Sequence, residues 1–183
     1  MPGRIVPWPA FAGPPVSWAK SVGGVLHGSA GSERRSCAAS RPKVMISPMT
    51  VLVSRRESFN AAHQLRDPRR SDDENRRLFG KCANLHGHNY VLEVVVAGKI
   101  DDASGYVFDL KRLSDVICRK IIQDVDHRNL NADVPWLAGR IPTAENLAVA
   151  FWERLRPELP AGLLRSVRVW ETDKNWAEVG AHA

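Results

Sequence analysis

Alternating apolar and polar positions predict two strands near the start of the folded region. From Thr50 onward, apolar residues at positions 51, 53 and 59 alternate with polar ones, which predicts a strand that runs towards His63. A second alternating run, with positions 90, 92, 94 and 96 on one face, predicts the strand that pairs with it. Residues 66–77 between them are charged and contain a proline, so we expect a polar connection there.

Two helices follow, each marked by apolar residues at three- and four-residue steps. The first covers residues 109–125, with Asp109 as its N-cap and an apolar stripe through positions 110, 113, 117 and 121. The second begins after Pro142 with Thr143 as its N-cap, buries positions 147, 151 and 155, and ends at Pro157.

Two short alternating runs, 165–172 and 174–182, lie at the end of the chain and are separated by a turn around Asp173. The order is therefore strand, strand, helix, helix, strand, strand. Hairpin-like pairs at each end with helices between them predict an α+β fold, in which an antiparallel four-stranded sheet carries two helices on one face.

The first 48 residues differ in composition from the rest. They hold seven of the 12 prolines and six of the 13 glycines, without a sustained helical or strand period. We expect residues 1–48 to be a disordered extension and residues 49–183 to form one domain. This extension has three alternative interpretations: a poorly ordered tail, a start codon assigned too far upstream, or a targeting peptide.

Charge and cysteine content narrow the class of protein. Of the formal charge of +6, the extension carries +5, so the domain is nearly neutral and lacks the basic footprint of a nucleic-acid-binding protein. No run approaches the roughly 18 consecutive apolar residues of a membrane span. Three irregularly spaced cysteines indicate reduced thiols and a cytoplasmic location rather than a disulfide framework.

The segment Cys82-Ala-Asn-Leu-His86-Gly-His88 is the strongest chemical signal in the chain. Because side chains two apart on a strand share a face, His86 and His88 converge, and strand pairing brings His63 alongside. Three neutral imidazoles with an open fourth position are typical of a catalytic Zn²⁺ site, although iron or nickel could use the same nitrogens. A simple polar turn is the alternative interpretation.

Cys82 has two interpretations of its own. It is either a fourth ligand that closes the metal site, or a free thiolate close to the cation and to Lys81. The Cys-x₃-His-x-His spacing differs from the paired-cysteine pattern of structural zinc sites, which favours the free thiolate.

Two further carboxylates complete the candidate set. Asp126 next to His127 at a helix exit suits an acid–base pair, with a helix C-terminal cation as the alternative. Glu171 shares a strand face with Val167 and Val169, so we expect its carboxylate to point inward, where it could bind the N–C–NH₂ edge of a heterocycle. If the strand leaves the core there, Glu171 meets solvent instead.

Taken together, these segments resemble one enzyme family. FNAAH, FGKC, HGHNY, SGYVFDL, DHRNL, PTAENLA and ETDKN occur in this order over about residues 50–178 and are similar to the 6-pyruvoyl-tetrahydropterin synthase and 6-carboxy-tetrahydropterin synthase family. The resemblance implies the tunnelling fold, in which trimers form a continuous antiparallel barrel. Such trimers commonly stack as hexamers, with active sites between subunits.

The resemblance also implies a role for each candidate residue. The implied ligands of a catalytic zinc are His63, His86 and His88. The implied general base is Cys82, its acid–base partners are Asp126 and His127, the pterin anchor is Glu171, and Thr143 lies beside the substrate. That substrate is 7,8-dihydroneopterin triphosphate, a small molecule. Candidate contacts for its triphosphate, each of which also fits a solvated surface charge, are Arg76, Arg77, Lys81 and Arg128.

Members of this family fall into two branches that form different products. The pyruvoyl branch stops after triphosphate elimination and internal redox, whereas the carboxy branch also cleaves the side chain and releases acetaldehyde on the way to queuosine. The gap between Cys82 and His86 resembles the carboxy type, whereas LFGKC, residues 66–77 and ETDKN resemble the pyruvoyl type. We favour 6-carboxy-tetrahydropterin synthase, the commoner role in bacteria, with the pyruvoyl synthase as alternative. A non-catalytic zinc-stabilised binding module, closed by Cys82, is the alternative of another class.

Overall fold

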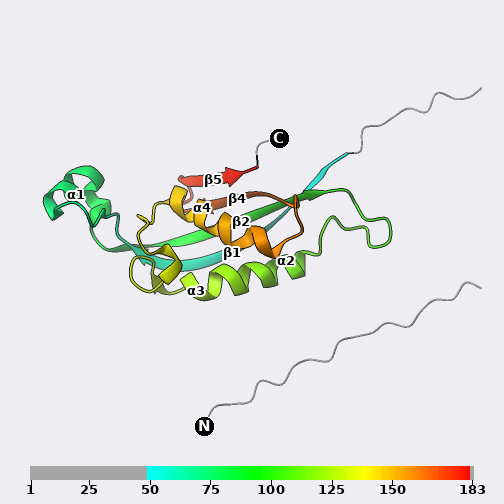
Figure 1. Cartoon of the computed structure of the whole chain (residues 1–183), viewed down its shortest axis with the longest axis horizontal. Coiled ribbons are helices and arrows are strands. Elements are labelled where there is room, and N and C mark those ends of the chain that lie inside the picture. The colour runs from blue at the N-terminus through cyan, green and yellow to red at the C-terminus, as the bar shows by residue number, and fades with distance from the viewer. Residues whose placement is uncertain (1–48, 182–183) are drawn as a thin grey trace, which may run out of the picture. The chain divides into compact units, whose positions relative to one another are not determined.

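The computed structural model describes residues 49–181, so the expected extension over 1–48 lies outside the described residues. Within them, one sheet has the strand order β3-β1-β2-β4-β5 (Figure 1). Its strands are β1 (Val51–His63), β2 (His86–Gly98), β3 (Arg128–Asn129), β4 (Leu164–Trp170) and β5 (Trp176–Gly180). The four longer strands are antiparallel neighbours, which confirms the predicted sheet. The two-residue β3 adds a parallel strand beside β1.

The helices that follow β2 in the chain pack on one face of this sheet (Figure 1). The helix expected over 109–125 forms as α2 (Leu110–Ile117), a π-helical turn η2 (Cys118–Ile122) and α3 (Gln123–Val125) in direct succession. A 3-10 turn, η3 (Pro135–Leu137), precedes α4 (Ala144–Leu155), and another, η4 (Arg156–Glu158), follows it. Pro157 therefore lies within a last turn rather than at the helix end. None of the helices described is both long and apolar enough to cross a bilayer.

The core between sheet and helices is organised by aromatic rings. Phe59 and Tyr90 stand opposite each other in the β1–β2 register, and their rings stack with centroids 4.8 Å apart. Phe151 of α4 meets Phe59 edge-on at 6.1 Å. All three side chains are essentially buried, so aromatic contacts tie α4, which packs over β4 and β5, to the β1–β2 pair.

The opposite face of the sheet carries a row of ion pairs across its strands. Glu93 accepts a hydrogen bond from Arg56 Nε at 3.1 Å and lies 3.6 Å from Arg168, which also donates to Glu178 at 2.7 Å. Glu93 is 8% exposed, and burying a carboxylate to this extent is costly unless cations accompany it. The two guanidinium groups thus allow a buried charge on this face.

The connection between β1 and β2 is not the plain loop expected over 66–77. It contains helix α1 (Asp72–Phe79) and the 3-10 turn η1 (Gly80–Ala83), which project from one end of the sheet (Figure 1). Ser71 and Glu74 cap the helix reciprocally: the Glu74 N–H donates to Ser71 Oγ at 3.3 Å, and the Ser71 N–H donates to Glu74 Oε2 at 2.8 Å. Hydrophobic periodicity does not reveal α1, because its only buried residue is Asn75.

Replacing Phe151 by Ala should lower the free energy of unfolding by about 3–5 kcal/mol, because the change removes a buried ring and leaves a cavity. Val149→Ala is a matched control on the same helix: Val149 is 38% exposed, and its truncation should cost less than about 0.5 kcal/mol. Urea denaturation followed by circular dichroism measures both. Equal losses in the two variants would contradict this placement of the core.

Candidate metal centre and active site

Three imidazoles meet where β1 ends and β2 begins. His63 stands opposite His86 in the register and His88 stands opposite Ala61, so the three rings share one face of the sheet. Their ligand nitrogens lie within 4.8 Å of one another, and the Nε2 atoms of His63 and His86 are 3.2 Å apart. The structure therefore brings together the three histidines that the sequence identifies.

Gly87 allows the two strands to approach closely between these ligands. A Cβ atom at this position would stand 3.3 Å from the carbonyl oxygen of Ala61. Such a contact is tighter than side chains normally make, so a larger residue would push β1 and β2 apart beside the imidazoles.

Backbone carbonyl groups orient two of the rings. Nδ1 of His63 lies 2.8 Å from the carbonyl oxygen of Pro142, and Nδ1 of His86 lies 2.8 Å from that of Asn84. A carbonyl oxygen only accepts hydrogen bonds, so each ring donates from Nδ1–H and keeps the lone pair on Nε2. Both Nε2 atoms are therefore free to bind a metal ion, with their ring orientation already set.

The burial of the cluster also suits a metal ion. Burial lowers the pKa of His63 and of His88 below the ordinary value, which favours the neutral imidazole that metals require. Nε2 of His88 is buried, and within residues 49–181 it has no hydrogen-bond partner. A buried polar atom without a partner is costly, and a metal ion would satisfy it. Three imidazole donors are a set that catalytic zinc uses.

Glu171 lies directly beside the imidazoles, although it is not on a strand as expected. β4 ends at Trp170, and the Glu171 N–H donates to the carbonyl oxygen of Asn175 at 3.0 Å in the turn that follows. Its Oε1 lies 3.5 Å from Nε2 of His63 and 3.7 Å from Nε2 of His88. The carboxylate therefore reaches the imidazoles from the first residue of the turn, two positions beyond the buried Val169.

A polar hollow of about 500 Å³ adjoins Glu171. Its lining includes Thr143, Glu145, Lys174 and Trp176. Thr143 also caps α4, because its Oγ1 accepts a hydrogen bond from the Asn146 N–H at 3.3 Å. Of these, only Thr143 is among the candidates from the sequence. The signal for the others is their position within or next to PTAENLA and ETDKN. The hollow is large enough for a small heterocyclic ligand.

Cys82 lies apart from the imidazoles. It is exposed within η1 and does not belong to the histidine group, so within one chain it does not close the coordination sphere. Its carbonyl oxygen accepts a hydrogen bond from the Leu65 N–H at 2.7 Å, which ties η1 to the end of β1. This placement favours a free thiol over a fourth ligand.

Asp126 and His127 form a pair between α3 and β3, with Nδ1 of His127 3.0 Å from Oδ2 of Asp126. Asn60 of β1 holds both: its N–H donates to Asp126 Oδ1 at 2.8 Å, and its carbonyl oxygen accepts from the His127 N–H at 2.6 Å. The Asn60 hydrogen bond holds the pKa of Asp126 below its usual range. The carboxylate therefore stays charged and orients the imidazole.

The backbone of His127 is strained. Its φ of 57° lies in the left-handed region that residues other than glycine seldom adopt. Strain of this kind costs about 1–3 kcal/mol and is concentrated at functional sites. The His127 side chain is 76% exposed, so a single chain leaves the ring open to a substrate or to another copy.

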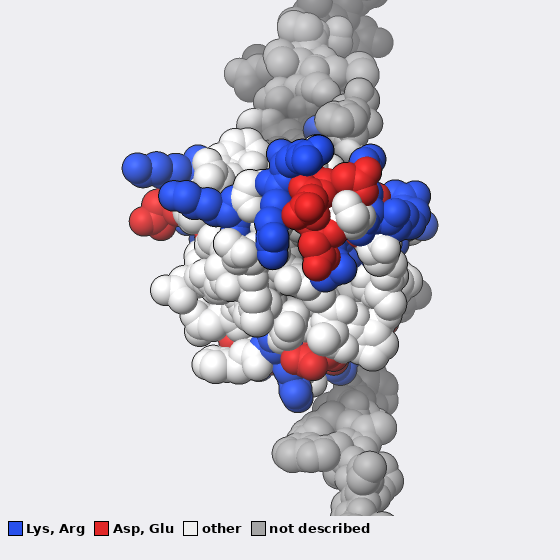
Figure 2. Space-filling view, turned by 90° about the vertical axis from the view of Figure 1, so that its left-hand side faces the viewer, with Lys and Arg blue, Asp and Glu red and all other residues white. Residues whose placement is uncertain are grey.

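The four candidate triphosphate contacts are all exposed: Arg76, Arg77, Lys81 and Arg128. At the end of the molecule where α1 projects, basic and acidic side chains are mixed on the surface (Figure 2). None of the four lines the hollow beside Glu171. Their placement fits solvated surface charges as well as anion contacts.

The fold and the three-imidazole site define an α+β protein suited to bind a metal ion, and comparison with known proteins identifies its family. A family model described as 6-pyruvoyl tetrahydropterin synthase matches residues 52–182. A 6-pyruvoyl tetrahydrobiopterin synthase from Homo sapiens is 49% identical over 125 residues, which is 67% of this chain and 86% of the human one. The solved structure of the Caenorhabditis elegans 6-pyruvoyl tetrahydropterin synthase matches with a TM-score of 0.69 at 38% identity, covering 73% of this chain and 97% of that one.

A more distant relative comes from Archaeoglobus fulgidus and is provisionally named a 6-carboxy-5,6,7,8-tetrahydropterin synthase. It is 32% identical over 133 residues, which is 70% of this chain and 95% of that one. The chain therefore belongs to the 6-pyruvoyl tetrahydropterin synthase family of lyases.

Replacing His88 by Ala should abolish tight metal binding, because it removes one of three donors. Elemental analysis after dialysis should find about one zinc per wild-type chain and less than about 0.1 in the variant. His127→Asn is the control, since it lies outside the cluster and Asn tolerates a positive φ. Metal retained by His88→Ala, or lost from His127→Asn, would contradict this site.

Proposed function

We propose that the chain is a zinc-dependent lyase that converts 7,8-dihydroneopterin triphosphate to 6-pyruvoyl-tetrahydropterin with elimination of triphosphate. The observation that carries the proposal is the group of three imidazoles at the β1–β2 junction, close to a carboxylate that borders a polar hollow. Relatives named 6-pyruvoyl tetrahydrobiopterin synthase, at 39–49% identity, support the choice of reaction.

This choice replaces the 6-carboxy product favoured from the sequence. Relatives with the 6-pyruvoyl name reach 49% identity, whereas the relative with the 6-carboxy name reaches 32%. Similarity over 125 residues outweighs both the three-residue gap between Cys82 and His86 and the frequency of the carboxy role in bacteria. Synthesis of the 6-carboxy precursor of queuosine becomes the alternative.

Each side chain of the site has a separate role in the proposed reaction. Bound zinc would chelate the side-chain hydroxyls of the substrate and acidify the adjacent C–H. The Cys82 thiolate takes that proton, and His127, oriented by Asp126, returns one to the product. The conversion takes two such proton transfers. In the first, the alcohol next to the ring loses its C–H and O–H hydrogens, the ring C=N bond gains two, and that alcohol becomes a ketone. In the second, loss of the proton on the next side-chain carbon expels the triphosphate with its bonding electrons, and the resulting enol becomes the second ketone as its hydroxyl proton moves to carbon. Glu171 accepts hydrogen bonds from the N–C–NH₂ edge of the pterin, and Thr143 lies on the same hollow.

Assembly of several copies would complete this site. In one chain the Cys82 thiol is exposed, the His127 side chain is 76% exposed, and neither group belongs to the histidine cluster. We propose trimers, stacked as a hexamer, in which the acid–base pair of one copy serves the metal centre of the next. The reduced cysteines favour a cytoplasmic location for this assembly.

The zinc-loaded protein should convert 7,8-dihydroneopterin triphosphate to the 6-pyruvoyl product and inorganic triphosphate without acetaldehyde. Mass analysis of the pterin and an aldehyde assay measure both products. Acetaldehyde together with a 6-carboxy product would contradict the main proposal and support the alternative.

Cys82→Ala is the variant that separates an enzyme from a zinc-stabilised binding module. In the enzyme, the variant should keep its zinc and lose about 10²–10⁴-fold in turnover, because only the general base is removed. In the module, zinc would be lost with the thiol and the chain would unfold on chelation.

Glu171→Gln should weaken binding of a dihydropterin about 10–100-fold and leave the zinc content unchanged, because a neutral amide cannot offer two acceptors to two donors. Isothermal titration calorimetry measures the affinity. Glu145→Gln changes the other carboxylate of the same hollow and should have a smaller effect. The reverse order of the two effects would assign the anchor to Glu145.

A further inference from the structure

We propose that Asn75 is a positioning residue for the Cys82 thiol. The proposal rests on the proposed function, in which Cys82 is the general base. The connection over residues 64–85 begins after His63 and ends before His86, so it joins two of the metal-binding histidines and carries the thiol between them. The geometry within this connection therefore sets the distance between the thiol and the metal centre.

Asn75 organises the first half of the connection. The residue is 2% exposed, although it lies on a helix whose other residues are at least partly exposed. Its Oδ1 accepts a hydrogen bond from the Asp67 N–H at 2.8 Å. The two N–H groups of its Nδ2 are shared among the carbonyl oxygens of Asp67, Arg70 and Ser71, which lie at 3.1, 3.2 and 3.0 Å. One amide thus fixes the backbone of the 67–71 turn against α1.

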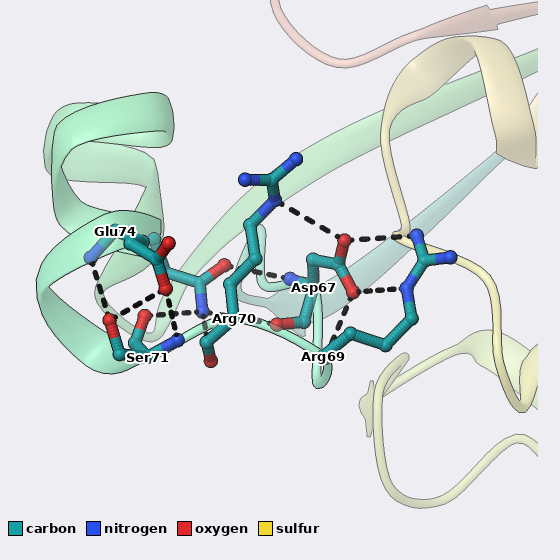
Figure 3. Close-up of polar contacts among 6 residues, drawn as sticks. Asp67, Arg69, Arg70, Ser71 and Glu74 are labelled. Carbon is teal, nitrogen blue, oxygen red and sulfur yellow. Dashed lines mark hydrogen bonds and ion pairs between the residues drawn. The ribbon is translucent and has the colours of Figure 1, made fainter.

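Ion pairs between charged side chains also stabilise the 67–71 turn (Figure 3). The Asp67 carboxylate accepts hydrogen bonds from Arg69 Nε and Nη2 at 2.9 and 3.0 Å, and Arg70 Nε lies 3.4 Å away. The hydrogen bonds from Arg69 lower the pKa of Asp67 to about 2. The carboxylate is therefore charged throughout the neutral pH range, and the turn keeps its shape there.

The 67–71 turn influences the position of Cys82 through α1 and η1. α1 leads directly into η1 at Gly80, whose φ of 55° redirects the chain two residues before Cys82. From the other side, the Leu65 N–H donates to the Cys82 carbonyl oxygen at 2.7 Å. The backbone at Cys82 is therefore held both by the end of β1 and by the helix that Asn75 anchors.

Apolar packing does little to hold α1. Leu78 is 59% exposed, and Phe79 is only partly buried. Because the hydrophobic core does not include this helix, loss of the Asn75 amide would loosen the connection without disturbing the sheet. The effect should therefore appear at the Cys82 thiol before it appears in global stability.

The test compares Asn75→Ala with Ser71→Ala, a matched control that removes the α1 N-cap but keeps the Asn75 amide. Iodoacetamide alkylation of each cysteine is followed by peptide mass spectrometry between about pH 6 and 9, with Cys118 as internal reference. In Asn75→Ala the Cys82 rate should change at least about threefold in either direction, whereas in Ser71→Ala it should change less than about twofold. Zinc content and the Cys118 rate should stay unchanged.

Turnover supplies the second measurement. In Asn75→Ala, kcat should fall at least about tenfold while KM stays within about threefold, because the thiol is misplaced but the hollow is intact. If Asn75→Ala does not fold, the isosteric Asn75→Asp, which keeps the Oδ1 acceptor, takes its place in both measurements. An unchanged Cys82 alkylation rate, or an equal kcat loss in Ser71→Ala, would overturn the proposal.

Failure of the proposed function would look different. The wild-type chain would then release no triphosphate, and only the proposed function would fall. The alkylation rates of the variants would still decide whether Asn75 positions the thiol, because they do not depend on turnover.

Discussion

The pairing register of β1 and β2 is the constraint on which the rest of the site depends. It places His63 opposite His86 and Ala61 opposite His88. Because side chains alternate between faces, a slip of one residue would turn the imidazoles of one strand away from those of the other. The same register stacks Phe59 on Tyr90 in the core. A single ladder of backbone hydrogen bonds thus sets both the packing of the sheet and the geometry of the metal centre.

The remaining functional groups come from turns that are tied to this rigid pair of strands. Cys82 is held to the end of β1 by the Leu65 N–H, and His127 is held by both backbone groups of Asn60. Glu171 reaches the imidazoles from the turn after β4. A fixed metal site with acid–base groups on tethered turns suits a reaction in which a base approaches a metal-bound substrate from outside.

Hydrophobic periodicity predicted the four antiparallel strands and the two core helices, because each of these elements turns a regular set of apolar side chains towards the core, although β5 buries them only in part. It could not predict α1, whose buried residue is the polar Asn75, or the two-residue β3, which is too short to leave a pattern. The histidines could be grouped because a His-x-His pair shares a strand face and the hairpin is local. Hydrophobic periodicity could not place Lys174 and Trp176 at the hollow, because their position there depends on where the turn after β4 meets the start of α4.

X-ray absorption at the zinc edge of the zinc-loaded protein shows whether the three imidazoles form an open metal site. We expect three imidazole nitrogens at about 2.0–2.1 Å from the zinc, with an oxygen in the fourth position and no sulfur neighbour. A sulfur atom at about 2.3 Å from the zinc would place Cys82 in the coordination sphere. That result would contradict both the open site and the free general base.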